Sequence, residues 1–187
     1  AWAAHIKLTP ADDFARIVES AKDGDVIELA PGLYKKKLTI RAAITLKGPK
    51  LTDDKDRLDA KKAAVIDARG RGSGITVRVP QVVVENVAVI NYGKNLYARN
   101  AGVRVTDGAD RVVLRGLTLK GPGFGIRGDR LEELVVEDCR IEGVRSMHVL
   151  DRGDGVFLNY VKRPKLTGNA ARNVRDLSLI HISEPTR

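Results

Sequence analysis

The chain has 187 residues, enough for one domain with a buried core, and its 33 Lys and Arg outnumber its 24 Asp and Glu, giving a formal net charge of +9. No apolar run is long enough to span a bilayer, and the single cysteine excludes an internal disulfide. The positive charge suits acidic partners, but it is scattered, without a basic helix or an aromatic-rich basic patch. We therefore expect no nucleic-acid partner.

Residues 1–8 open on AWAA, which resembles the small-residue end of an export signal, and they are expected to form a tail. A helix is predicted over residues 9–24, because Thr9 suits the N-cap, Pro10 the first helical position and Gly24 the C-terminal end. One face of this helix carries the apolar residues Phe14, Ile17, Val18 and Ala21. Such an amphipathic helix is expected to cap the open end of the β structure that follows.

Four short strands are predicted next, at residues 26–29, 38–40, 44–46 and 65–66. They are expected to form the start of the repeat structure described below. Between the third and the fourth lies a charge-dense insert, Leu51–Lys62, which is expected to be an exposed loop rather than a site.

The stretch from residue 74 to residue 176 repeats one pattern: Gly and an aliphatic residue, a short polar turn, then a second run of alternating apolar residues. The copies are GITVRVPQVVVENVAVIN (74–91), GVRVTDGADRVVLRGLTLKG (102–121), GIRGDRLEELVVEDCRIEG (125–143) and GVFLNYVKRPKLTGNAARN (155–173). Aligning them gives these columns: Ile75, Val103, Ile126 and Val156; Val84, Leu114, Val136 and Leu166; Val87, Leu117, Cys139 and Asn169; and Val89, Leu119, Ile141 and Ala171. Inserts at Tyr92–Ala101 and Arg145–Asp154 absorb the longer spacings.

This column register predicts an all-β fold, a right-handed single-stranded parallel β-helix over residues 25–176. The inward residues of one coil stack on those of the next and form a continuous apolar core. On the outward side, Glu85, Arg115 and Glu137 are expected to form a charge ladder of alternating sign. A β-sandwich of unrelated strands would contain similar turns, but it predicts no such columns.

Residues 177–187, LSLIHISEPTR, break the columns where the repeat should continue. They resemble the in-frame translation of a transposase sequencing adaptor. We therefore expect these residues to be non-native and the β-helix to be truncated at its C-terminal end.

Arg104 and Arg127 are the candidate ligand-binding residues, because they occupy equivalent outward positions one coil apart, flanked by Thr76 and Phe157. Stacked guanidinium groups suit a uronate carboxylate or a membrane phosphate; the alternative is a pair of solvated strand residues. The acidic residues nearby are predicted to lie in turns at unrelated offsets, which argues against a shared Ca²⁺ site: Asp107, Asp110, Asp129 and Glu132. We identify no set of catalytic residues.

Met147 and His148 are the candidate metal ligands, with Cys139 in the neighbouring column. A thioether, an imidazole and a thiolate together suit Cu(I), so copper is the candidate metal. The alternative is that Met147 and His148 are ordinary loop residues and Cys139 is a buried, inert thiol.

Residues 67–105 and the run DRGDGVFL at Asp151–Leu158 resemble the periplasmic β-helix protein of nitrous oxide reductase maturation, the NosD type, within the pectin-lyase-like superfamily. The resemblance rests on the IDARG turn at residues 66–70, the NYGKNLYARNAG insert at residues 91–102 and the RGDG coil opening. It covers about Thr9 to Asp176. The chain departs from the family in the length of Leu51–Lys62.

The resemblance implies an exported, periplasmic and non-catalytic accessory protein. Such a protein works with the membrane component of an ABC-type transporter and a copper chaperone to assemble the copper–sulfur centre of nitrous oxide reductase. It transfers no metal motif onto numbered residues of this chain. The alternative, permitted by the fold and the basic charge, is a polysaccharide lyase or epimerase that binds acidic, uronic-acid polymers.

Overall fold

Three parallel sheets wrap around one core in the computed structural model, which describes residues 3–181, with side chains up to residue 178. Sheet A contains β1 (His5–Leu8), β2 (Val26–Leu29), β5 (Thr45–Lys47), β8 (Val83–Glu85), β11 (Val113–Arg115), β14 (Val135–Glu137) and β17 (Lys165–Thr167). Sheet B contains β3 (Gly32–Tyr34), β6 (Ala64–Asp67), β9 (Val87–Ile90), β12 (Thr118–Lys120), β15 (Arg140–Glu142) and β18 (Ala170–Arg172). Sheet C contains β4 (Leu38–Ile40), β7 (Ile75–Val77), β10 (Ala101–Val105), β13 (Phe124–Glu132), β16 (Val156–Lys162) and β19 (Ser178–His181).

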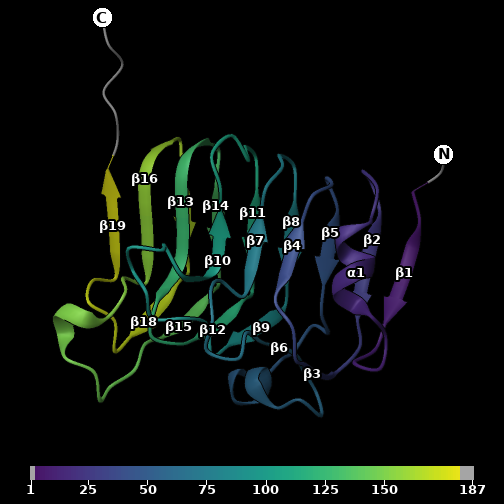
Figure 1. Cartoon of the computed structure of the whole chain (residues 1–187), viewed down its shortest axis with the longest axis horizontal. Coiled ribbons are helices and arrows are strands. Elements are labelled where there is room, and N and C mark those ends of the chain that lie inside the picture. The colour runs from purple at the N-terminus through teal and green to yellow at the C-terminus, as the bar shows by residue number, and fades with distance from the viewer. Residues whose placement is uncertain (1–2, 182–187) are drawn as a thin grey trace, which may run out of the picture.

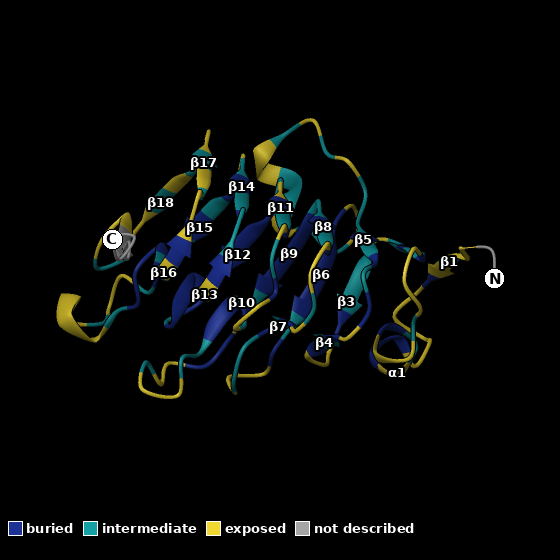
Figure 2. Cartoon of the chain, turned by 90° about the horizontal axis from the view of Figure 1, so that it is seen from above, coloured by how far each residue is buried: buried dark blue, intermediate teal, exposed yellow. Residues whose placement is uncertain are grey.

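The chain visits the sheets in turn, so each coil adds one strand to each sheet and the coils stack along the long axis of the molecule (Figure 1). The strand register confirms the predicted columns: Val103 pairs with Ile75 and Ile126, and Leu114 pairs with Val84 and Val136. The fold is therefore a parallel β-helix. Buried residues recur on the strands of every coil (Figure 2). Their apolar side chains form one continuous cluster.

The N-terminal region differs from the prediction in two ways. Residues 5–8 are not part of a tail, because they form β1, which pairs with β2 at the edge of sheet A; residues 1 and 2 lie outside the described residues. The helix α1 spans only Phe14–Glu19, because Thr9 and Asp12 close a turn of their own in which the Thr9 N–H and hydroxyl donate to the Asp12 carboxylate at 2.7 and 2.9 Å. It ends at Glu19, well before Gly24.

The short helix α1 packs beside β4 and buries Phe14, Ala15 and Val18 in the core. The Phe14 ring meets Tyr34 edge-on at 4.9 Å between centroids. The helix thus takes the place that a further strand of sheet C would occupy, while β1 extends sheet A. The prediction that a helix covers the whole end of the coil is therefore wrong. Among the described residues, no helix is long and apolar enough to cross a membrane.

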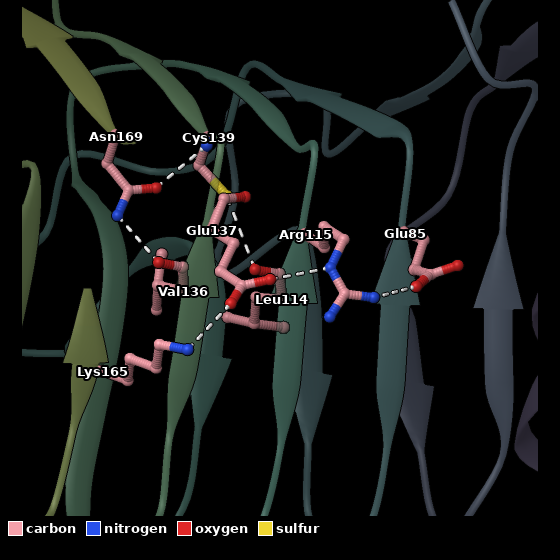
Figure 3. A network of polar contacts seen from close by, with 8 residues as sticks. All are labelled: Glu85, Leu114, Arg115, Val136, Glu137, Cys139, Lys165 and Asn169. Atoms are coloured by element: carbon pink, nitrogen blue, oxygen red, sulfur yellow. Dashed lines mark hydrogen bonds and ion pairs between the residues drawn. The ribbon is translucent and has the colours of Figure 1, made fainter. Parts of the chain in front are cut away.

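The predicted charge ladder on sheet A is confirmed (Figure 3). Arg115 on β11 pairs with Glu85 of one neighbouring coil at 2.7 Å and with Glu137 of the other at 2.9 Å. Lys165 continues the ladder, 3.7 Å from Glu137. Because Arg115 is half exposed, each of these ion pairs contributes little to the free energy of unfolding. A shifted strand register would separate the opposite charges, so the ladder favours the observed register.

Asn169, the last residue of the third predicted column, uses its side chain to bond the backbone of the preceding coil (Figure 3). Asn169 accepts a hydrogen bond from the Cys139 N–H at 2.9 Å and donates to the Val136 carbonyl at 2.8 Å. Its amide thus satisfies backbone groups at the turn between sheets A and B. The interior position of Cys139 is confirmed, since its side chain is fully buried.

The insert Leu51–Lys62 is not a simple exposed loop. It contains a short 3-10 helix, η1 (Asp54–Leu58), beside β9 and sheet B (Figure 1). Leu51 and Ala60 pack on a small apolar cluster outside the main core, which consists of Ala63, Val65 and Ala88. The prediction of a plain loop was wrong, because these small residues form an apolar surface on the outer face of sheet B against which the insert packs.

At the C-terminal end, β19 pairs in parallel with β16, with Ser178 opposite Val156. The backbone pairing therefore continues past the break that the column pattern predicts after Asp176. The non-native origin of residues 177–187 stays a prediction, and residues 182–187 lie outside the described part of the chain.

Candidate functional site

The predicted arginine pair lies on the outer face of sheet C, and the two residues are direct neighbours. Arg104 on β10 pairs in register with Arg127 on β13, with Thr76 of β7 beside Arg104 and Phe157 of β16 beside Arg127. The column register alone produces this arrangement, because residues at one alternation position of stacked parallel strands face the same way. Their role as ligand-binding residues stays a prediction.

Arg127 is held tightly and is already paired. Its Nε and Nη2 donate to the two carboxylate oxygens of Asp129 at 2.9 and 3.0 Å. Its guanidinium lies against the rings of Phe124 and Phe157, 4.9 and 4.6 Å from their centroids, and the two rings also contact each other at 5.1 Å between centroids. Cation–π contact with two aromatic rings and a bidentate carboxylate make this a fixed, neutralised cation rather than one available for a ligand.

Asp129 collects further donors and is 1 % exposed. Asn159 Nδ2 donates to it at 3.4 Å, and Arg99 Nη1 lies 3.9 Å from its carboxylate. Burial alone would raise the pKa of Asp129, but the ion pair with Arg127, the charge of Arg99 and the Asn159 hydrogen bond together lower that pKa below its ordinary value. The carboxylate is therefore ionised at neutral pH and serves two arginines.

Arg104 is the cation that this carboxylate does not satisfy. Its Nε is buried and has no hydrogen-bond partner within the described residues. Burial, followed by the charges of Arg99, Arg127 and Arg78, lowers the pKa of Arg104, and Asp129 opposes the shift. A guanidinium remains protonated despite such a shift. The surface around Arg104 thus carries an excess of positive charge and an N–H donor without an acceptor. Both features suit the binding of a carboxylate or phosphate oxygen.

We call Arg99, Arg104, Arg127 and Asp129 the arginine cluster. Asp129 and Glu132 were predicted to lie in turns, and this is wrong, because β13 runs for nine residues and contains both. Asp129 faces outward on it beside Arg127. The sequence signal was available, because residues two apart on a strand share a face, so an Arg-x-Asp spacing predicts an ion pair. Arg99 had no such signal, since the conformation of the insert that carries it decides its position.

The predicted metal ligands lie in different settings. His148 is exposed and caps the 3-10 helix η2 (Val149–Asp151), with its Nδ1 accepting from the Leu150 N–H at 3.3 Å. The neighbouring Met147 carbonyl accepts two hydrogen bonds from Arg152, at 3.0 and 2.7 Å. Cys139 is buried in the core. Among the side chains that the structure describes, up to residue 178, no group of three His, Cys, Asp or Glu could hold a metal ion, and the Met147–His148 pair stays a prediction.

Cys139 is expected to resist thiol reagents in the folded protein. Burial raises the pKa of its thiol to about 11, so the reactive thiolate is scarce and shielded. Titration with a chromogenic disulfide reagent at pH 8 should release no dye from the native chain and one equivalent after unfolding in guanidinium. A control variant, Ser146→Cys, places a thiol on the exposed insert and should react in the folded state. Rapid reaction of the unsubstituted native chain would contradict the buried position.

The fold places the chain in a known structural class. It matches the crystal structure of a pectin methylesterase mutant in complex with a hexasaccharide with a TM-score of 0.50 and 16% identity, over 89% of this chain and 67% of that chain. A second pectin methylesterase complex matches with the same TM-score and 15% identity. At such identity the likeness concerns the fold alone. It confirms the predicted class, an all-β right-handed parallel β-helix of the pectin-lyase-like type.

Two curated relatives match by sequence. The chain is 37% identical over 119 residues to the Pseudomonas aeruginosa protein named "Probable ABC transporter binding protein NosD", and 31% identical over 120 residues to the Stutzerimonas stutzeri protein of the same name. These matches cover 64% of this chain and 28% of each relative. The resemblance to NosD-type proteins predicted from the sequence is confirmed, although the chain spans well under a third of their length. No protein-family model matches the chain.

Proposed function

We propose that this chain is part of a periplasmic accessory protein that associates with an ATP-driven transporter during assembly of the copper–sulfur centre of nitrous oxide reductase. The observation that carries the proposal is the 37% identity to a protein whose name describes binding to an ABC transporter. The aligned region is 28% of that relative. We therefore propose that this chain contributes one segment of β-helix coils to a larger protein.

The shape of the fold supports a docking role. Stacked coils present long, flat, rigid sheets whose outward side chains vary without disturbing the core, and such surfaces serve extended protein contacts. We assign the arginine cluster on sheet C to this contact, with Arg104 as the residue that receives an acidic group of the transporter or of a copper chaperone. Copper is the cargo of this process, and no ligand for it is assigned among the described residues.

A chimera tests the proposal. The aligned residues of Pseudomonas aeruginosa NosD are replaced by the matching residues of this chain, and the chimera is expressed in a denitrifying host that lacks its own gene. We expect the visible absorption of the copper–sulfur centre in the host's nitrous oxide reductase to return. Arg104→Glu in the chimera should reduce the recovered absorption about tenfold, because a like charge replaces an attraction at the docking surface.

Arg111→Glu is the matched control, since Arg111 is an exposed arginine on the turn before β11 and lies outside the cluster. It should leave the absorption unchanged. A well-expressed, exported chimera that restores no copper–sulfur absorption would overturn the proposal. Release of unsaturated products from a uronic-acid polymer by the same chimera would instead favour a polysaccharide lyase.

A further inference from the structure

A groove of about 450 Å³ lies between the insert Leu51–Lys62 and the outer face of sheet B. Its floor follows the stack of coils, since Thr118 on β12, Arg140 on β15 and Ala170 on β18 are direct neighbours in the register. Leu58 of η1 forms part of the opposite wall. The groove is separate from the arginine cluster, which lies on sheet C.

The insert is fixed in place as a wall of this groove. Arg57 donates from Nη1 to the carbonyls of Gly116 and Asp138 at 3.4 and 3.3 Å, and Asp54 accepts from Arg140 Nε at 3.1 Å. At the other end, Leu51 and Ala60 sit on the small apolar cluster of sheet B. The three hydrogen bonds join residues 59, 81 and 86 positions apart, so the groove exists only in the folded chain.

Positive charge dominates the lining. The cationic side chains are Lys55, Arg57, Lys120, Arg140 and Arg172, and the carboxylates are Asp54 and Glu142. The lining therefore has a net charge of +3. Most of the excess lies on sheet B, because Lys55 on the insert is paired with Asp53 at 2.8 Å. Lys120 and Arg172 share Glu142, at 3.7 and 2.9 Å, which leaves the row along β12, β15 and β18 positive. A ligand of complementary charge must be an anion.

The floor also offers a hydrogen-bonding group that the protein leaves unused. Thr118 is 8% exposed, and its buried Oγ1 has no hydrogen-bond partner within residues 3–181. An unpaired buried hydroxyl is costly, and a natural fold seldom retains one without a partner in some state of the protein. A carbonyl or carboxylate oxygen lying in the groove would satisfy it.

We propose that this groove binds an extended acidic segment of a partner protein, with Thr118 hydrogen-bonding its backbone and Lys120 and Arg172 pairing with its carboxylates. Strands of stacked coils lie about 4.8 Å apart, so the floor from β12 to β18 spans about 10 Å, the length of three residues of extended peptide. None of the residues that line the groove is aromatic, so it lacks the stacking platform that suits a sugar ring. The proposal goes beyond the transporter role and does not depend on it.

Fluorescence anisotropy on the full 187-residue chain tests the inference. The probe is a fluorescein-labelled seven-residue peptide of alternating glutamate and valine, and a peptide of alternating lysine and valine is the charge control. We expect saturable one-to-one binding of the acidic peptide that weakens as salt rises, and no binding of the basic one. Lys120→Glu should weaken binding at least about tenfold, because an attraction becomes a repulsion.

Lys165→Glu is the matched control. Lys120 and Lys165 are both exposed lysines on the outer face, each 3.7 Å from a glutamate of a neighbouring coil, but Lys165 lies on sheet A. It should change the affinity less than about twofold. Thr118→Val keeps the shape of the side chain and should weaken binding about fivefold without lowering the thermal unfolding temperature.

The inference is overturned if the acidic peptide does not bind saturably, or if Lys165→Glu weakens it as much as Lys120→Glu does. An oligogalacturonate that binds in a Lys120-dependent manner while the peptide does not would also overturn it, and would assign the groove to a saccharide.

Discussion

Replacing Asp129 by alanine should lower the free energy of unfolding by about 3 kcal/mol, because it leaves the guanidinium of Arg127 buried against two phenyl rings without its counter-charge. Arg127 is 8% exposed and Asp129 is 1% exposed, so water compensates poorly for the lost partner. Two hydrogen bonds, at 2.9 and 3.0 Å, are lost together. Chemical denaturation followed by circular dichroism measures the change.

Two further variants separate the buried charge from the loss of a carboxylate as such. Asp107→Ala removes a half-exposed partner of Arg130 and should cost no more than about 0.5 kcal/mol. The double variant Arg127→Met and Asp129→Leu removes both charges and should recover most of the loss, because a hydrophobic pair can replace a buried ion pair. A double variant as unstable as Asp129→Ala alone would show that shape, not charge, governs this position.

The same ion pair should make the free energy of unfolding decrease at acidic pH. Since folding lowers the pKa of Asp129, the folded state favours its ionised form, and the stabilisation is present above the unfolded pKa of about 3.9 and is lost as the pH falls through the lower folded pKa. Asp129→Asn should therefore flatten the decline in stability below about pH 4. Other lowered carboxylates, such as Asp25, titrate in both proteins and cancel in the comparison.

Gly153→Ala should destabilise the fold by about 3 kcal/mol, at the upper end of what overpacking costs. A methyl group at this position would lie 2.3 Å from the backbone carbon and oxygen of Gly123 in the neighbouring coil. The two coils cannot move apart, because the Gly153 N–H donates to the Pro122 carbonyl at 3.1 Å and the Gly125 N–H donates to the Asp154 carbonyl at 3.0 Å. Thermal unfolding of the purified variant measures the effect.

Gly128→Ala is the control for this substitution. Gly128 is also buried in the stack, but a methyl group there would meet only the ends of leucine side chains, at 3.2 Å or more, and these can adjust. It should change the stability by less than about 1 kcal/mol. If the two variants proved equally stable, the close approach of the backbones at Gly153 would not limit the spacing of the coils.

The sequence predicted the coil class, the inward columns and the sheet A ladder because all three follow from one regularity. In a parallel β-helix the neighbour of a residue is the equivalent residue of the next coil, so register read from the chain becomes register in space. Ile75, Val103 and Ile126 stack as the alignment implies, and so do Glu85, Arg115 and Glu137. Arg104 and Arg127 became neighbours for the same reason.

Only the tertiary structure decided what the irregular segments do. The inserts have no equivalent in the next coil, so the register says nothing about where they fold, and Arg99 reaches Asp129 from one of them. The insert Leu51–Lys62 likewise makes a wall for the groove over Thr118 through contacts with residues far along the chain. By itself the sequence determined the coil and its columns, because these follow from the repeat. The paths of two inserts decided the charge balance at Arg104 and the groove on sheet B, and the repeat does not determine those paths.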